Sequence, residues 1–129
     1  MLVVDASFAL PACRVENGFA RFVEPLVAPP FMWSEARSSL HETLWRGEIE
    51  TQVANDILER LERCPVKPTT YQNLGRDAWA IADELGWAKT YDAEYLALAR
   101  HLGGRVVTLD ARFKRGADRT GIVVAPSEL

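Results

Sequence analysis

The sequence predicts an α/β fold in which a central, mostly parallel sheet lies between layers of helices. Two apolar runs each end in a carboxylate, since Leu2–Val4 precedes Asp5 and Arg105–Leu109 precedes Asp110. Between these runs the apolar residues recur every three to four positions, which is the spacing of helices that cover a sheet. Strands that alternate with helices, without an internal repeat, indicate parallel strands joined by crossover helices.

The remaining elements follow from the same patterns. Additional strands are expected at Leu26–Ala28, Val66–Pro68 and Ile122–Ala125, the first and last of which are stopped by proline. Longer helices are expected at Phe31–Gly47, Val53–Leu61, Ala78–Leu85 and Tyr95–Leu102. A short helix should begin near Phe8, and we expect Pro11 to bend it.

The size and composition indicate one domain that spans residues 1–129. Of these residues 48% are hydrophobic and 26% are charged, as is usual for a domain with its own core. No stretch approaches the ~20 apolar residues of a membrane span, and no leader pattern precedes Leu2–Val4. We therefore expect a soluble, cytoplasmic protein. Cys13 and Cys64 lack zinc or redox spacing and are expected to be free thiols.

Four carboxylates stand near the ends of predicted elements: Asp5, Glu35, Asp92 and Asp110. Each has an ordinary structural explanation. Asp5 and Asp110 are placed to cap the helices that follow them, and Asp92 would be favoured in a first helical turn by the helix dipole. Glu35 lies on the polar stripe of its helix, where Glu42 is a rival candidate. Taken singly, none of these acids requires a chemical role.

Sheet topology favours a shared role, because ligands of open α/β sheets bind beyond the carboxyl ends of the strands. Carboxylates gathered there would repel one another unless a cation neutralised them, and an oxygen-only site suits Mg²⁺ or Mn²⁺. His41 and His101 show no ligand pairing, which disfavours zinc. The formal net charge of −3 argues against a protein that coats nucleic acid, but it is compatible with such an acidic pocket.

Four blocks of the sequence resemble the PIN-domain family, and specifically the VapC toxins, along essentially the whole chain. The blocks are Val3–Ser7, Ala28–Leu40 with its continuation Arg46–Ile49, Thr90–Ala99 and Val107–Phe113. The resemblance implies a PIN-like three-layer α/β/α fold. It also implies a metal-dependent endoribonuclease that acts as the toxin of a toxin–antitoxin pair.

The resemblance further assigns roles to individual residues. The catalytic and metal-binding carboxylates would be Asp5, Glu35, Asp92 and Asp110, supported by Ser7, Thr108 and Glu94. Glu42 falls outside the motif. One or two Mg²⁺ or Mn²⁺ ions would polarise the scissile phosphate and activate the attacking water, with Asp110 as an orienting residue or weaker ligand.

The expected partners are RNA, a second copy of the chain and a small antitoxin. Four basic residues, Arg112, Lys114, Arg115 and Arg119, follow Asp110 closely enough to bind RNA phosphates, although a solvated turn explains them equally well. Single-stranded or looped RNA is favoured over duplex, since its bases are splayed. The resemblance implies a homodimer and a VapB-like antitoxin that fills the cleft. The four tryptophans exceed what a small core needs, although at least two should pack in it.

Two other functions stay open on the sequence alone. A receiver-like phosphoacceptor signalling domain also gathers acids around Mg²⁺, but it needs an acidic pair after the first strand and a lysine after a late one. Here Asp5 stands alone, and Ile122–Val124 is followed by Ala125–Pro126. The other alternative is a non-catalytic module that uses a PIN-like fold to bind RNA or protein.

Overall fold

The computed structural model describes all residues from 1 to 129 and is built on a five-stranded sheet in the order β3-β2-β1-β4-β5. The strands are β1 (Leu2–Val4), β2 (Leu26–Ala28), β3 (Lys67–Pro68), β4 (Arg105–Val107) and β5 (Val123–Val124). Every neighbouring pair is parallel. The predicted parallel sheet is therefore confirmed.

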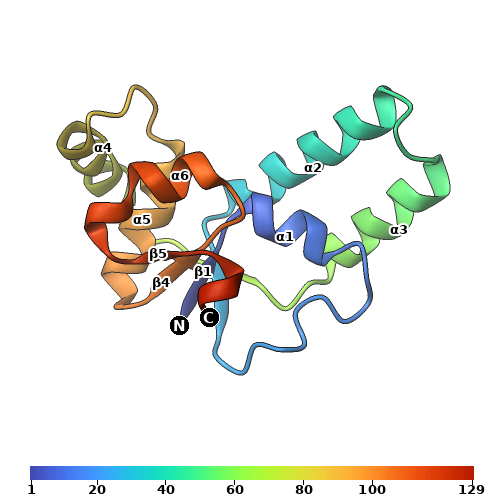
Figure 1. The fold of residues 1–129 in the computed structure, drawn as a ribbon, viewed down its shortest axis with the longest axis horizontal. Coiled ribbons are helices and arrows are strands. Elements are labelled where there is room, and N and C mark those ends of the chain that lie inside the picture. The colour runs from blue at the N-terminus through green and yellow to red at the C-terminus, as the bar shows by residue number, and fades with distance from the viewer.

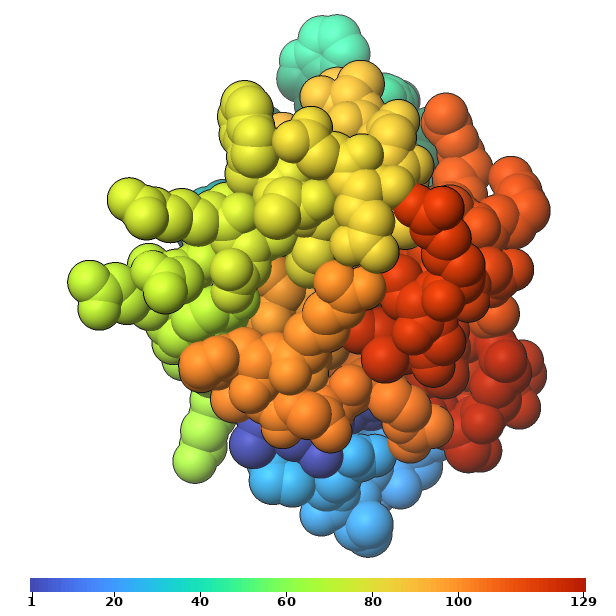
Figure 2. All heavy atoms as spheres, turned by 90° about the vertical axis from the view of Figure 1, so that its left-hand side faces the viewer, coloured from blue at the N-terminus to red at the C-terminus, as the bar shows by residue number.

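Helices cover both faces of this sheet. They are α1 (Ala6–Ala12), α2 (Phe31–Trp45), α3 (Thr51–Glu62), α4 (Leu74–Leu85), α5 (Tyr91–Leu102) and α6 (Ala111–Gly116), with short 3-10 turns η1 (Asp118–Thr120) and η2 (Pro126–Glu128). The first three helices pack together on one side, while α5 lies against β1 and β4 on the other side with α4 outside it (Figure 1). Figure 2 shows that outer face, with α4 above α5. The three-layer α/β/α prediction is confirmed.

The core explains why the central elements carry continuous apolar runs. All three residues of β1 are completely buried, as expected for a parallel strand covered on both faces. In α5 the whole run Tyr95–Ala99 is buried between the sheet and α4. Cys13 and Cys64 are free thiols, as expected.

The strand order places a crevice at a defined point. The chain passes from β1 outward to β2 and β3, then returns to β4 on the other side of β1. The order in which strands are added to the sheet thus reverses between β1 and β4. Doubly wound sheets bind their ligands at such a point. Receiver domains have the order 2-1-3-4-5 instead, so the receiver alternative is wrong.

Several element boundaries differ from the prediction. The strand expected at Arg105–Leu109 ends at Val107. The hydroxyl of the next residue, Thr108, donates to Asp5 at the end of β1, and Leu109 is exposed. In α2, Met32 is buried where Trp33 was expected, since Trp33 is only partly covered. Pro11 lies inside α1, which ends one residue later. No helix combines the length and the apolar character needed to cross a membrane.

Candidate active site

Asp5 is held at the carboxyl end of β1 by a network that reaches β4. Its Oδ1 accepts hydrogen bonds from the Ser7 hydroxyl at 2.8 Å and from the backbone N–H of Phe8 at 3.1 Å. The Thr108 hydroxyl, which follows β4, donates to Oδ2. The backbone N–H of Asp110 in turn donates to Thr108 Oγ1 at 3.0 Å. One threonine hydroxyl therefore joins the acids that follow two neighbouring strands.

The environment of Asp5 opposes its negative charge. The residue is only 5% exposed, and this burial is the largest of several contributions that together raise the pKa of its carboxyl to about 6. Hydrogen bonds from Thr108, Ser7 and Phe8 act in the opposite direction, while the charge of Asp92 raises the pKa further. The predicted capping role of Asp5 is confirmed, and the charge of Asp92 is close enough to act on its carboxyl.

Glu35 is oriented by a buried tyrosine from the opposite helical layer. Glu35 lies near the start of α2, and its Oε1 accepts a hydrogen bond from the Tyr95 hydroxyl at 2.8 Å. Tyr95 is 1% exposed, and burial together with the charge of Glu35 raises its pKa well above the usual range. The hydroxyl therefore remains a donor and fixes one oxygen of the carboxylate, which leaves the other oxygen for a ligand.

Asp92 and Asp110 complete the acidic group. Asp110 caps α6, because its Oδ1 accepts from the backbone N–H groups of Arg112 at 2.9 Å and Phe113 at 3.2 Å. Asp92 lies in the first turn of α5. Burial, followed by the charges of Asp110 and Glu35, raises the pKa of Asp92 to about 6. The predicted carboxylates thus share one electrostatic environment.

A hollow of about 640 Å³ opens onto three of these acids. Its lining includes Glu35, Asp92 and Asp110 together with the cations Lys89 and Arg112. Neither cation forms an ion pair within the chain. The hollow therefore presents carboxylates for a cation and two uncommitted positive groups for an anion in the same space.

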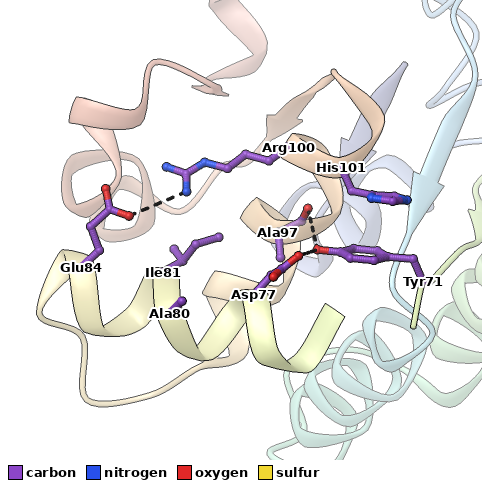
Figure 3. Close-up of a pocket in the computed structure, with 8 residues that line it drawn as sticks. All are labelled: Tyr71, Asp77, Ala80, Ile81, Glu84, Ala97, Arg100 and His101. Atoms are coloured by element: carbon purple, nitrogen blue, oxygen red, sulfur yellow. Dashed lines mark hydrogen bonds and ion pairs between the residues drawn. The ribbon is translucent and has the colours of Figure 1, made fainter. Parts of the chain in front are cut away.

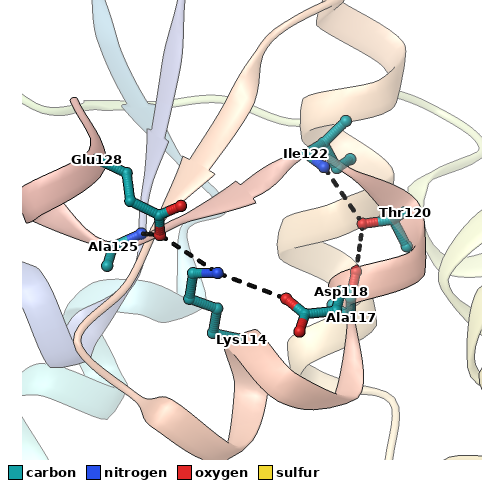
Figure 4. A network of polar contacts seen from close by, with 7 residues as sticks. All are labelled: Lys114, Ala117, Asp118, Thr120, Ile122, Ala125 and Glu128. Atoms are coloured by element: carbon teal, nitrogen blue, oxygen red, sulfur yellow. Dashed lines mark hydrogen bonds and ion pairs between the residues drawn. The ribbon is translucent and has the colours of Figure 1, made fainter.

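The other basic residues expected at the site, Lys114, Arg115 and Arg119, do not line the hollow, and Arg119 donates to the backbone carbonyl of Glu84. The ammonium of Lys114 lies 3.4 Å from Asp118 Oδ1 and 3.2 Å from Glu128 Oε1 (Figure 4). Glu128 Oε1 also accepts from the backbone N–H of Ala125 at 2.9 Å. Lys114 thus joins α6 to the C-terminal turn η2.

A separate hollow of about 340 Å³ lies between α4 and α5 (Figure 3). Here Tyr71 stacks on His101 with ring centroids 3.8 Å apart, and its hydroxyl donates to Asp77 Oδ2 at 2.7 Å. Arg100 and Glu84 pair with each other at 3.9 Å. Because these polar groups are already paired within the chain, the acidic hollow is the better candidate for a reaction site.

The donor set fits a hard divalent cation. Every side chain of the acidic hollow that is able to bind a metal is a carboxylate, which suits Mg²⁺ or Mn²⁺ rather than zinc. The raised pKa of Asp92 reflects burial and the repulsion of Asp110 and Glu35, and a cation would relieve this strain. No three acidic, histidine or cysteine side chains are already arranged around one metal position. Mg²⁺ commonly binds through one or two carboxylates, with water completing its coordination.

Sequence reasoning missed two contributors to this site. Lys89 precedes α5 and gave no signal, because a lone lysine in a loop is usually solvated. The sequence predicts Tyr95 only as the first residue of a helix. A fully buried tyrosine normally needs a hydrogen-bond partner, and that rule was the available signal for its contact with Glu35.

The fold and the acidic strand ends define the class of protein. A family model described as PIN domain matches residues 2–119, so the chain belongs to the PIN-domain family. The resemblance seen in the sequence is thus confirmed.

Individual relatives narrow the comparison. VapC ribonuclease Mb0985 from Mycobacterium bovis and Ribonuclease VapC9 from Mycobacterium tuberculosis are each 33% identical to this chain over 130 residues, covering 98% of it and 99% of the relative. Ribonuclease VapC3 from Pyrobaculum aerophilum is 32% identical over 97 residues, covering 74% of this chain and 65% of the relative. The crystal structure of PAE2754 from the same organism has a TM-score of 0.79 at 21% identity, covering 98% of this chain and 91% of the other. It supports the fold alone.

Proposed function

We propose that this protein is a divalent-metal-dependent endoribonuclease of the VapC type. The observation that carries the proposal is the hollow at the strand ends, where Glu35, Asp92 and Asp110 face the same space as Lys89 and Arg112. This combination suits phosphodiester cleavage, because a cation and fixed positive groups stabilise charge on the reacting phosphate. Full-length relatives named VapC ribonuclease support the same reaction.

Each side chain has a proposed task. Asp5, Glu35, Asp92 and Asp110 would hold Mg²⁺ or Mn²⁺, which when bound stabilises negative charge on the phosphate and favours ionisation of the attacking water.

The remaining groups position RNA and the carboxylates. Arg112 and Lys89 would bind the phosphate, whereas Lys114 and Arg115 lie outside the hollow. Ser7 and Thr108 would keep Asp5 ionised and oriented by donating to it. Tyr95 would orient Glu35 by donating a hydrogen bond to it. Glu94, whose pKa is raised by burial, would add negative charge at the rim.

The names of the relatives also support a biological setting. We propose that the chain is the cytoplasmic toxin of a toxin–antitoxin pair, that it works as a homodimer, and that a VapB-like antitoxin inhibits it. An arginine of the antitoxin would pair with the carboxylates, since bidentate arginine–carboxylate contacts are strong and specific.

The test is cleavage of total RNA by the purified chain with Mg²⁺ or Mn²⁺, compared with EDTA. Asp92→Asn should lower the cleavage rate by on the order of 100-fold, because it removes a metal-binding carboxylate while keeping the size of the side chain. Asp83→Asn, the same change on the exposed face of α4, should leave the rate unaltered. Undiminished cleavage in EDTA or by Asp92→Asn would contradict the proposal.

A non-catalytic RNA-binding module is the second candidate. The observation that favours it is that no three carboxylates are arranged around one metal position. A folded, antitoxin-free protein that binds RNA and Mg²⁺ but produces no new 5′ ends would establish this alternative.

A further inference from the structure

A second hollow, of about 390 Å³, adjoins the acidic one and shares Glu35 and Tyr91 with it. It lies along the polar face of α2 and the start of α5. Its lining consists of Phe31, Ser34, Glu35, Ser38, Ser39, Glu42 and Tyr91. An RNA strand that crosses the acidic hollow therefore has a continuous path into this one.

One side of the second hollow is formed by the exposed aromatic ring of Tyr91, which packs against the core through Phe31. Tyr91 is 60% exposed, although large aromatic side chains are usually covered. Its ring packs against Phe31 with centroids 5.9 Å apart, and Phe31 packs at 5.2 Å against Tyr95 in the core. Tyr91 is thus supported from within and open outside, the arrangement that proteins use to stack a nucleobase.

The charges of the two hollows differ, so each hollow fits a different part of an RNA strand. The acidic hollow contains Lys89 and Arg112, which suit a phosphate. The second hollow is lined by no lysine or arginine, and its two carboxylates, Glu35 and Glu42, disfavour a phosphate, although Arg46 lies 3.6 Å from Glu42 Oε2 and offsets part of that charge. Serine hydroxyls and carboxylates instead accept hydrogen bonds from neutral donors such as the amino group of a base. An uncharged planar group is the occupant that this lining fits.

We propose that Tyr91 and the serine face of α2 form a subsite for one nucleobase of single-stranded RNA, next to the phosphate that is cleaved. The base stacks on the ring of Tyr91, and its amino edge meets Glu42 or the serines. A duplex base is already stacked and paired, so the subsite selects single-stranded or looped RNA. The subsite rests on the proposed ribonuclease function and adds to it the element that reads the substrate.

The first experiment measures base stacking directly. A short single-stranded RNA carrying 2-aminopurine at one position at a time is titrated with the purified chain in EDTA. We expect quenching of the fluorophore at one position. Tyr91→Leu should abolish that quenching and weaken RNA affinity by about tenfold, the size of effect expected for one lost base stack. Tyr91→Phe keeps the ring and should keep the quenching.

The matched control is Trp79→Leu, which removes an equally exposed aromatic residue from α4, away from both hollows. It should alter neither quenching nor affinity. Equal effects of Trp79→Leu and Tyr91→Leu, or quenching that persists in Tyr91→Leu, would overturn the subsite.

A cleavage experiment with Mg²⁺ or Mn²⁺ separates the subsite from the reaction itself. Tyr91→Leu should slow cleavage of the intact RNA by about tenfold. An RNA that lacks the stacked base should be cleaved at the same rate by Tyr91→Leu and by the unaltered protein. An equal loss on both RNAs would mean that the substitution damages Asp92 instead. Base-dependent quenching without any cleavage would refute the ribonuclease and leave the subsite standing. Absence of RNA binding and of cleavage would refute both.

Discussion

Asp92 shows at the scale of a single residue how the site opposes the stability of the fold. Its carboxyl accepts no hydrogen bond, and burial together with Asp110 and Glu35 raises its pKa from 3.8 to about 6. The folded chain therefore binds this proton more tightly than the unfolded chain does. The resulting stabilisation is complete below about pH 4 and is lost as the pH rises through about 6. At neutral pH the ionised carboxylate opposes folding.

Asp92→Asn should consequently stabilise the protein at high pH. In EDTA at about pH 8 we expect a gain of about 1–2 kcal/mol in the free energy of unfolding, after discounting the pKa shift for solvent screening at this half-buried position. At about pH 2.5 the gain should vanish, because this lies well below both pKa values and the wild-type carboxyl is then protonated in both states. Urea denaturation at the two pH values measures the difference. The exposed control Asp83→Asn should change little, and a gain that does not depend on pH would disprove the explanation.

At the scale of elements, a glycine in the left-handed conformation ends the helix that carries Asp92. The helix α5, which carries Asp92, ends at Gly103 with φ of 68°, a left-handed conformation that lets β4 follow at once. An added methyl group would have open space there, so the constraint is backbone conformation alone. Gly75, in the first turn of α4, also has open space but helical φ.

The two glycines should therefore respond in opposite ways to alanine. Gly103→Ala should destabilise the protein by about 1 kcal/mol, since L-residues are strained in the left-handed region. Gly75→Ala should stabilise it by up to about 0.5–1 kcal/mol through helix propensity and lower entropy of the unfolded chain. Denaturant midpoints compare the variants. The same sign of change at both positions would show that packing, not backbone conformation, decides the effect.

The boundaries of elements also show what sequence reasoning captures. The apolar strands and the acids that follow them could be predicted from the sequence. A carboxylate that follows a buried strand lies at the carboxyl edge of the sheet, where it caps the next helix. The contact of Tyr95 with Glu35 joins residues 60 positions apart, and only the packing of α5 against α2 reveals it. Lys114 was expected at the site, but it forms an ion pair with Glu128 in the C-terminal turn η2. Spacing along a sequence does not indicate such distant partners.

At the scale of the whole molecule, a protein with net charge −3 must bind RNA through local positive groups. Arg112 lines the acidic hollow without a partner, whereas Lys114 is paired with two carboxylates on the far side of α6. These neighbours in sequence therefore have different electrostatic surroundings. Two tryptophans, Trp45 and Trp79, are exposed, while Trp33 and Trp87 pack against the core.

Salt dependence of RNA binding should distinguish the two basic residues. Arg112→Gln should weaken binding and reduce the slope of log affinity against log salt by about 0.7, the value for one lost phosphate contact on a single strand. Lys114→Gln should leave that slope unchanged and instead increase hydrogen exchange at the C-terminal turn. Anisotropy titrations at several salt concentrations measure the slope. A larger change for Lys114→Gln would place the RNA path over α6.

The unfavourable position of Asp92 has an evolutionary consequence. Most substitutions in a folded domain are destabilising, yet replacement of this acid by asparagine should make the chain more stable. Mutation without selection for catalysis would therefore tend to remove the acid, and selection for stability would hasten its loss. Surveys of related chains should find asparagine or other neutral residues at this position in lineages that have lost the activity, often before their cores have changed.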